Sequence, residues 1–182
     1  MAKTIIVEEV KKIVQNVSDV LTPKFKNLDQ YIEAVHYLHG HPLEVAQTLS
    51  ERTKAGFSFK KYPLIALLQD FPERHGIKEG FEMEVNLHLL ICKSTQPTYK
   101  AEKRYEVNFN PFLYPIYDEL LNQIHKSKVF VTDSVETIQH TKIDRLYWGT
   151  EGAMSNKANI FLDHLDIIEV KELKLFIKKN YC

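Results

Sequence analysis

The chain has 182 residues, of which 44% are hydrophobic, and this indicates one domain with a sizeable core. Its 24 basic residues (lysine and arginine) balance 24 acidic ones, so no global basic field favours nucleic acid as a partner. Two widely separated cysteines, Cys92 and Cys182, indicate free thiols rather than a disulfide. The N-terminus lacks a signal-peptide pattern, and no run approaches the ~18 apolar residues of a membrane span, so we expect an intracellular or packaged protein.

The first third of the chain predicts two helices separated by a break. Residues 4–21 carry an apolar stripe at helical spacing, and Pro23 is expected to end that helix. The members of the stripe are Ile6, Val10, Ile13, Val17 and Val20, widened by Val14 and Leu21. Residues 31–38 favour a short strand or one turn of helix. After the break HGHP at 39–42, Pro42 opens a second predicted helix that runs to about Lys54.

Two segments in the middle of the chain read as strands. Residues 62–71, YPLIALLQDF, form a short apolar run beside two prolines and predict a buried strand. Residues 81–93 alternate strictly between apolar and polar side chains, which is typical of a strand with one wet face. Leu90 and Cys92 break the polar face, so we expect the end of this strand to be covered on both sides.

The most informative stretch is 104–130, RYEVNFNPFLYPIYDELLNQIHKSKVF, which predicts an amphipathic helix over 110–126. Asn110 is suited to cap its first turn, and Pro111 suits a position whose N–H has no partner. Pro115 either lies in that first turn or marks a later start at Tyr114. The apolar side chains that follow recur at helical spacing and predict a core helix laid across a sheet: Ile116, Leu120, Leu121 and Ile124.

The remaining segments predict strands and loops. Residues 129–131 and 144–148 favour strands, 133–141 a loop, and 173–177 a final strand, while 160–170 show mixed periodicity. Because the strands run together rather than alternating with helices, we predict an α+β fold with a small, mainly antiparallel sheet. The helices 4–21 and 110–126 are expected to share one face. We treat 1–182 as one domain, with 26–58 as an insertion or interface segment.

Two groups of polar residues could form a metal or catalytic site, but an ordinary structural role is commoner for residues in each pattern. His36, His39 and His41 lie close enough in sequence to imply a metal-dependent enzyme, which elemental analysis would detect, although their spacing is no standard ligand pattern. Glu82, Glu84 and His88 share one face of a strand and imitate an acid–base group, but a charged solvent face has the same pattern. We predict no catalytic residue, metal or cofactor.

A third cluster mixes cations with aromatic side chains. Lys60 and Lys61 lie beside Phe57, Phe59 and Tyr62, as on a surface that binds single-stranded nucleic acid. The same mixture suits a protein interface, which we favour. A nucleic-acid-binding module, with strongly salt-dependent binding, stays an alternative.

Four runs carry a resemblance to proteins encoded among phage structural genes: 62–73, 104–124, 140–149 and 165–177. Their arrangement is similar to that of phage neck proteins of the tail-completion, or tail-terminator, class. The resemblance implies an N-terminal helix, a small antiparallel sheet, a long helix across it and a C-terminal strand. It also implies a cyclic homo-oligomer, a hexamer or dodecamer, at the head–tail junction.

The expected partners of such a ring are other copies, the portal or connector, and tail proteins, with DNA passing through the channel without specific binding and no membrane. The expected location is the virion neck, assembled in the host cytoplasm. Aromatic residues in or beside predicted loops, together with two in the predicted strand 144–148, are the candidate subunit contacts, because aromatic anchors dominate interface energies. They are Phe57, Phe59, Tyr62, Tyr99, Tyr147 and Trp148.

Overall fold

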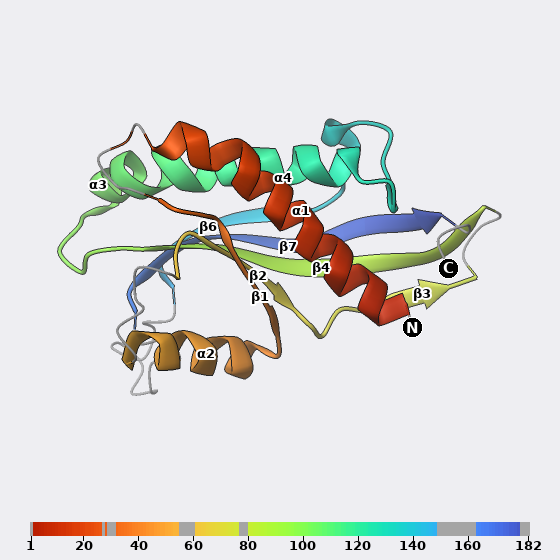
Figure 1. The fold of residues 1–182 in the computed structure, drawn as a ribbon, viewed down its shortest axis with the longest axis horizontal. Coiled ribbons are helices and arrows are strands. Elements are labelled where there is room, and N and C mark those ends of the chain that lie inside the picture. Colours follow the sequence, from red (N-terminus) through yellow and green to blue (C-terminus); the bar gives the residue numbers. More distant parts are fainter. Residues whose placement is uncertain are drawn as a thin grey trace.

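The computed structural model describes residues 2–26, 28, 32–54, 61–76, 80–148 and 163–178. They form an α+β fold in which one sheet separates two layers of helices (Figure 1). Helices α1 (Ala2–Phe25) and α4 (Tyr114–Lys126) cover one face, called here the inner face, and α2 (Pro42–Lys54) lies on the outer face. The predicted α+β class and the shared face of the two long helices are confirmed.

The described strands make one seven-stranded sheet with the central order β1-β2-β4-β7-β5, while β3 pairs with β4 and β6 pairs with β7. The β1–β2 pair is parallel, and the other pairs are antiparallel. The sheet is therefore mainly antiparallel, as predicted. The strand bounds are β1 His36–Gly40, β2 Leu64–Leu68, β3 Glu73–His75, β4 Phe81–Ser94, β5 Phe130–Val131, β6 Thr141–Trp148 and β7 Leu165–Lys178.

Helix α1 buries its apolar stripe against the sheet and α4, with two differences from the prediction. Val20 is 38% exposed, and Leu21 takes its place in the core. Pro23 does not end the helix, which continues to Phe25. The Phe25 ring packs edge-on against Phe112, with centroids 5.2 Å apart, and this contact holds the last turn in place beyond the proline.

The helix predicted to begin at Asn110 begins nine residues earlier, so that prediction was wrong. A continuous helix runs through α3 (Ala101–Arg104), a π-helical stretch η2 (Tyr105–Leu113) and α4. In an α-helix, the ring of Pro111 would clash with the carbonyl four residues earlier. The π register, in which the Tyr114 N–H donates to the Phe109 carbonyl, lets the chain pass Pro111 without a break.

Strand β4 confirms the predicted alternation and the covered end. Its inward side chains, from Met83 to Ile91, lie in the inner core with Ile116, Leu120 and Ile124 of α4. On the outer face, Leu90 and Cys92 are buried under α2 in a second apolar cluster. The residues that this cluster takes from α2 are Val45, Ala46 and Leu49.

The first half of β7 is buried on both faces, which explains the mixed periodicity of 165–170: Ile168 and Val170 lie in the inner core, and Leu165 and Ile167 lie in the outer cluster. A β-bulge follows directly after Val170. The register with β4 shifts between Leu87 and Leu89, and Glu172 has a positive φ of 53°. The inward side chains are Asp166, Ile168 and Val170 before the bulge and Leu173, Leu175 and Ile177 after it. Because a bulge adds one residue to one strand, the alternation changes phase there.

Candidate functional site

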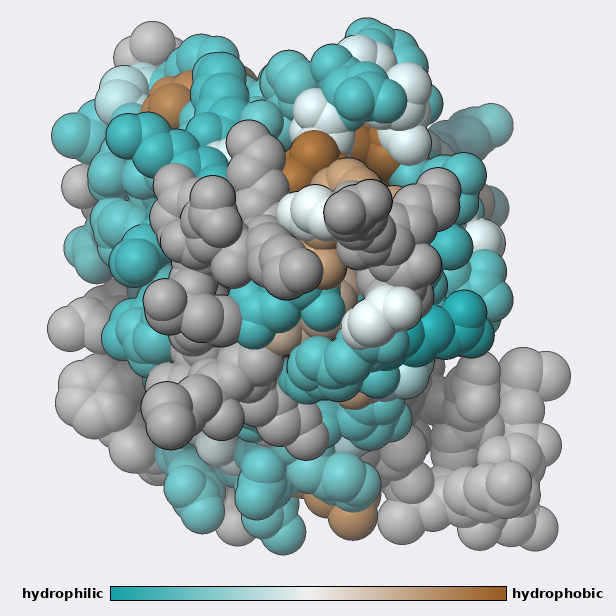
Figure 2. Space-filling model, turned by 90° about the vertical axis from the view of Figure 1, so that its right-hand side faces the viewer, coloured by the Kyte–Doolittle hydropathy of each residue, from teal (hydrophilic) through white to brown (hydrophobic). Residues whose placement is uncertain are grey.

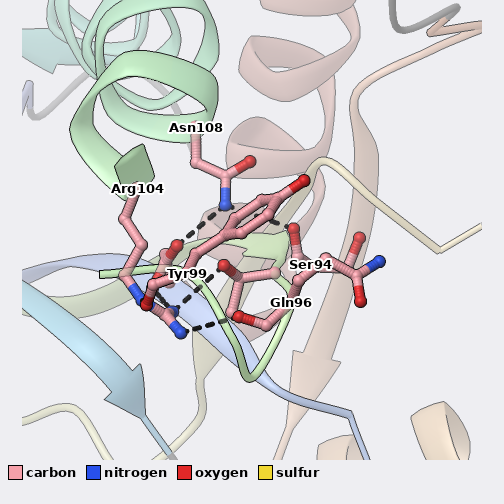
Figure 3. A network of polar contacts seen from close by, with 7 residues as sticks. Ser94, Gln96, Tyr99, Arg104 and Asn108 are labelled. Carbon is pink, nitrogen blue, oxygen red and sulfur yellow. Dashed lines mark hydrogen bonds and ion pairs between the residues drawn. The ribbon is translucent and has the colours of Figure 1, made fainter. Parts of the chain in front are cut away.

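A buried polar group lies where β4, β7 and the long helix meet (Figure 3). Arg104 and Asp166 are both fully buried, and Arg104 Nη1 donates to Asp166 Oδ1 at 2.6 Å. Asn108, one turn further along the helix, donates to the other carboxylate oxygen at 2.7 Å. Both oxygens of Asp166 are therefore satisfied, as a buried carboxylate requires.

The same arginine fastens the loop that joins β4 to α3. Its Nε donates to the Tyr99 carbonyl at 2.8 Å, and Nη2 donates to the Gln96 carbonyl at 2.8 Å (Figure 3). Nη1 also reaches Thr95 Oγ1 at 3.0 Å. A guanidinium with its donors spread over one carboxylate and three loop oxygens is a structural fastener. Tyr99, a predicted interface residue, lines the shallow 200 Å³ cleft beside this loop and is half-buried.

Lys93 is a second buried cation near this group. Lys93 on β4 lies opposite Asp166 on β7 in the strand register. Its amine, however, lies 5.0 Å from the centre of the Phe112 ring and makes a cation–π contact with it. The side chain is 8% exposed, and burial lowers the pKa of Lys93 to about 8. Because Arg104 and Asn108 occupy the carboxylate, the desolvated ammonium group gains little from it.

Strand β6 is held to α4 by a cluster of rings and charges. Tyr114 OH donates to Asp144 Oδ2 at 2.6 Å, and Lys142 Nζ donates to Asp144 Oδ1 at 2.6 Å. The Lys142 ammonium lies over the rings of Tyr114 and Tyr117, at 4.6 and 5.4 Å. Burial, with the nearby Asp144 carboxylate, raises the pKa of Tyr114 well above its usual value, so its hydroxyl stays a donor.

A hydrogen bond between Tyr117 and His140 adds to these contacts of β6 and its preceding residues with α4, which together are called here the brace. The Tyr117 hydroxyl contacts His140 Nε2, while His140 Nδ1 lies 2.8 Å from the Ile138 carbonyl. The Nδ1 contact requires a proton on that nitrogen, so Nε2 of a neutral ring accepts from the tyrosine. The residues that lead into β6 are thereby fixed against α4.

The predicted acid–base group on β4 is part of an ion-pair network on the outer face. Glu169 of β7 accepts from His88 at 2.9 Å and from Lys171 at 3.0 Å, and Arg145 contacts its other oxygen. Burial acts to raise the pKa of Glu169, but the bonds from Arg145 and Lys171 outweigh it, and the pKa is lowered. Glu84 is paired with Lys174 at 3.2 Å, so His88 and Glu84 serve separate pairs.

The three clustered histidines are not brought together. His36 and His39 lie on β1, three residues apart, so their side chains point to opposite faces of the sheet. His39 Nδ1 contacts Gln69 Oε1 at 3.0 Å on the inner side, and His41 Nδ1 accepts from the Leu43 N–H at 3.3 Å. Among the described residues, no group of three or more His, Cys, Asp or Glu has the arrangement of a metal site.

Tyr62 is buried, which corrects its assignment to an exposed contact surface. Its ring is 9% exposed under α2, and its hydroxyl donates to Asp163 Oδ2 at 3.0 Å. Lys61 is fully buried and bonds to the same oxygen at 2.7 Å, so it is no exposed cation for a nucleic acid. Phe57, Phe59 and Lys60 lie outside the described residues.

Two further predictions concern the end of β6 and the cysteine of β4. Tyr147 and Trp148 lie on β6, in agreement with the strand predicted for 144–148, and their side chains lie outside the described positions. Cys92 is buried, and burial raises the pKa of its thiol, so it is no activated thiolate.

A comparison of the chain with known protein families, curated proteins and solved structures found no match in any of the three. Within the described part of the chain, no helix has the length and apolar character needed to cross a bilayer.

Proposed function

We propose that this chain is a ring-forming structural protein of a phage head–tail junction, of the tail-completion class. In this role, copies of the chain join the connector or portal to the tail and leave a channel for DNA. The observation that carries the proposal is that two different strands lie on opposite edges of the sheet: β1 beyond β2, and β6 beyond β7.

Two different edges are what a closed ring requires. A cyclic assembly repeats one heterologous contact, in which one patch meets a different patch on the next copy. Among the described strands, β1 pairs only with β2 and β6 pairs only with β7. The outer edges of β1 and β6 therefore keep backbone donors and acceptors that a neighbouring chain can use.

The brace behind β6 supports its use as a contact surface. The hydrogen bond from Tyr114 holds β6 against α4, and the bond from Tyr117 holds His140, the residue before β6. A preorganised edge loses little conformational freedom on binding, which leaves more of the interaction energy for association. Lys142 and Arg145 also lie on this strand, and charged side chains restrain an exposed edge from nonspecific pairing.

The architecture agrees with the class that the sequence resembles. An N-terminal helix and a long helix share the inner face of a mainly antiparallel sheet, and β7 ends the described chain. The described carboxylates Asp166, Glu169 and Glu84 are all occupied in ion pairs, an arrangement that stabilises a scaffold.

The proposal is tested on assembled particles of the phage or prophage that encodes the chain. Imaging is expected to find the protein at the neck as a symmetric ring. A photo-crosslinking amino acid in place of Ile143, on β6, is expected to capture residues 36–40 of another copy. The control carries the same group in place of Glu102, an exposed residue of α3.

If particles lack the protein, or contain it without symmetric contacts between copies, the ring function is wrong. If a ring is present but Ile143 crosslinks to another segment, the ring stands and the pairing of β6 with β1 is wrong.

A further inference from the structure

A preformed cleft lies at the end of the sheet where β4 begins and β7 ends. Its volume is 290 Å³. Most of the coloured residues at this end of the molecule are hydrophilic, and hydrophobic ones gather in its upper part (Figure 2). The cleft is lined by the half-buried rings of Phe81 and Phe176 and, from the segment after β5, by Thr132, Asp133, Thr137 and Gln139.

The two rings give the cleft an aromatic wall. Phe81 and Phe176 lie side by side, with centroids 5.4 Å apart and planes inclined at 47°. Both are partly exposed, although phenylalanine has no polar atom that gains from contact with water. A planar group laid against these rings would bury that surface.

The opposite wall is held by its own hydrogen bonds. Thr132 Oγ1 lies 2.7 Å from His125 Nδ1 at the end of α4. Ser134 and Thr137 form a capping box, in which the Ser134 N–H donates to Thr137 Oγ1 at 3.1 Å. The Gln139 carbonyl accepts from the Lys174 N–H at 3.0 Å, which ties the end of the wall to β7. The cleft therefore needs little rearrangement to receive a ligand.

The cleft carries one exposed carboxylate, Asp133. No hydrogen bond or ion pair joins this carboxylate to another residue in the described part of the chain. Lys174 also lines the cleft: its ammonium lies 5.6 Å from the centre of the Phe176 ring and is paired with Glu84 at 3.2 Å, so an arriving planar group would share that ring with it. Glu136, in the turn beside the cleft, adds a second negative charge.

We propose that this cleft binds an arginine side chain presented by another protein chain. A guanidinium group is planar and stacks on aromatic faces, and its fork of donors matches a carboxylate. Phe81 and Phe176 supply the stacking surface, and Asp133 supplies the carboxylate. The cleft is lined by no residue of β1 or β6, so this inference does not depend on the ring.

The test is a titration of the isotopically labelled full chain with N-acetyl-arginine amide, followed by NMR. The matched probes are the citrulline amide, which is neutral and nearly the same shape, and the lysine amide. Arginine is expected to shift the backbone signals of Thr132, Thr137 and Gln139 and to bind roughly tenfold more tightly than citrulline.

The variants Asp133→Asn and Phe176→Leu are each expected to weaken arginine binding by about tenfold. The control Asp70→Asn removes an exposed carboxylate elsewhere and leaves binding unchanged. Equal affinity for citrulline, binding at other residues, or no binding would overturn the proposal. Equal affinity for lysine would overturn the assignment to arginine, because a simple charge contact would then suffice.

Discussion

Lys93 provides the sharpest test of the electrostatics, because its removal is expected to stabilise the protein. The side chain lies on the inner face with a desolvated ammonium group, and the carboxylate of Asp166 is already occupied by Arg104 and Asn108. Methionine has a similar length and no charge. The variant Lys93→Met therefore keeps the packing against Phe112 and removes the cost of desolvating the amine.

The size of the effect follows from the difference in pKa between the two states. Burial lowers the pKa of Lys93 from the ordinary 10.5 to about 8 in the folded chain. Between these values the unfolded chain binds more protons than the folded chain, so the free energy of unfolding of the wild type rises with pH. The cost of the charged amine is about 3 kcal/mol at pH 7 and about 1 kcal/mol at pH 10.

Urea unfolding followed by circular dichroism at pH 7, 8, 9 and 10 measures this difference. The gain from Lys93→Met is expected to shrink by about 2 kcal/mol across this range. Tyrosines with raised pKa values titrate in both proteins, so the comparison with the variant isolates Lys93. The matched control is Lys100→Met, which removes an exposed lysine. A gain that does not change with pH, or a variant less stable than the wild type at pH 10 and pH 7 alike, would refute the reasoning.

Three further substitutions test the core, the buried ion pair and the brace. Leu120→Ala should lower the free energy of unfolding, measured by urea unfolding, by about 2–5 kcal/mol, because Leu120 is fully buried. The control Leu43→Ala, at a position 57% exposed, should change it by less than about 0.5 kcal/mol. Arg104→Met leaves a buried carboxylate unpaired and should cost about 3–5 kcal/mol in the same assay; a cost near zero would contradict the fastener role. Tyr114→Phe should speed hydrogen exchange in β6 while leaving β4 protected, and unchanged exchange in β6 would show that the brace does not hold that strand.

Local periodicity was sufficient to predict most elements of this fold. The predicted bounds of α2, from Pro42 to about Lys54, agree with the structure. The strict alternation in 81–93 predicted β4, and the apolar residues Leu90 and Cys92 predicted that its end is covered on both faces. These features depend on which side of a segment is apolar, and that information lies within a few neighbouring residues.

The features that decide the candidate sites depend on contacts between distant segments. The Arg104–Asp166 pair joins residues 62 apart, and no local pattern distinguishes this arginine from an exposed one. Tyr62 is a candidate surface anchor by sequence because an aromatic, lysine-bearing segment precedes it, yet α2 covers its ring. The β-bulge at Glu172 changes the phase of the strand alternation, and the π-helical stretch before Pro115 changes the helical repeat. Both repeats are the basis of the sequence predictions. Periodicity thus determined which face of each element is apolar, whereas strand register and helix packing decided which charges meet in the interior.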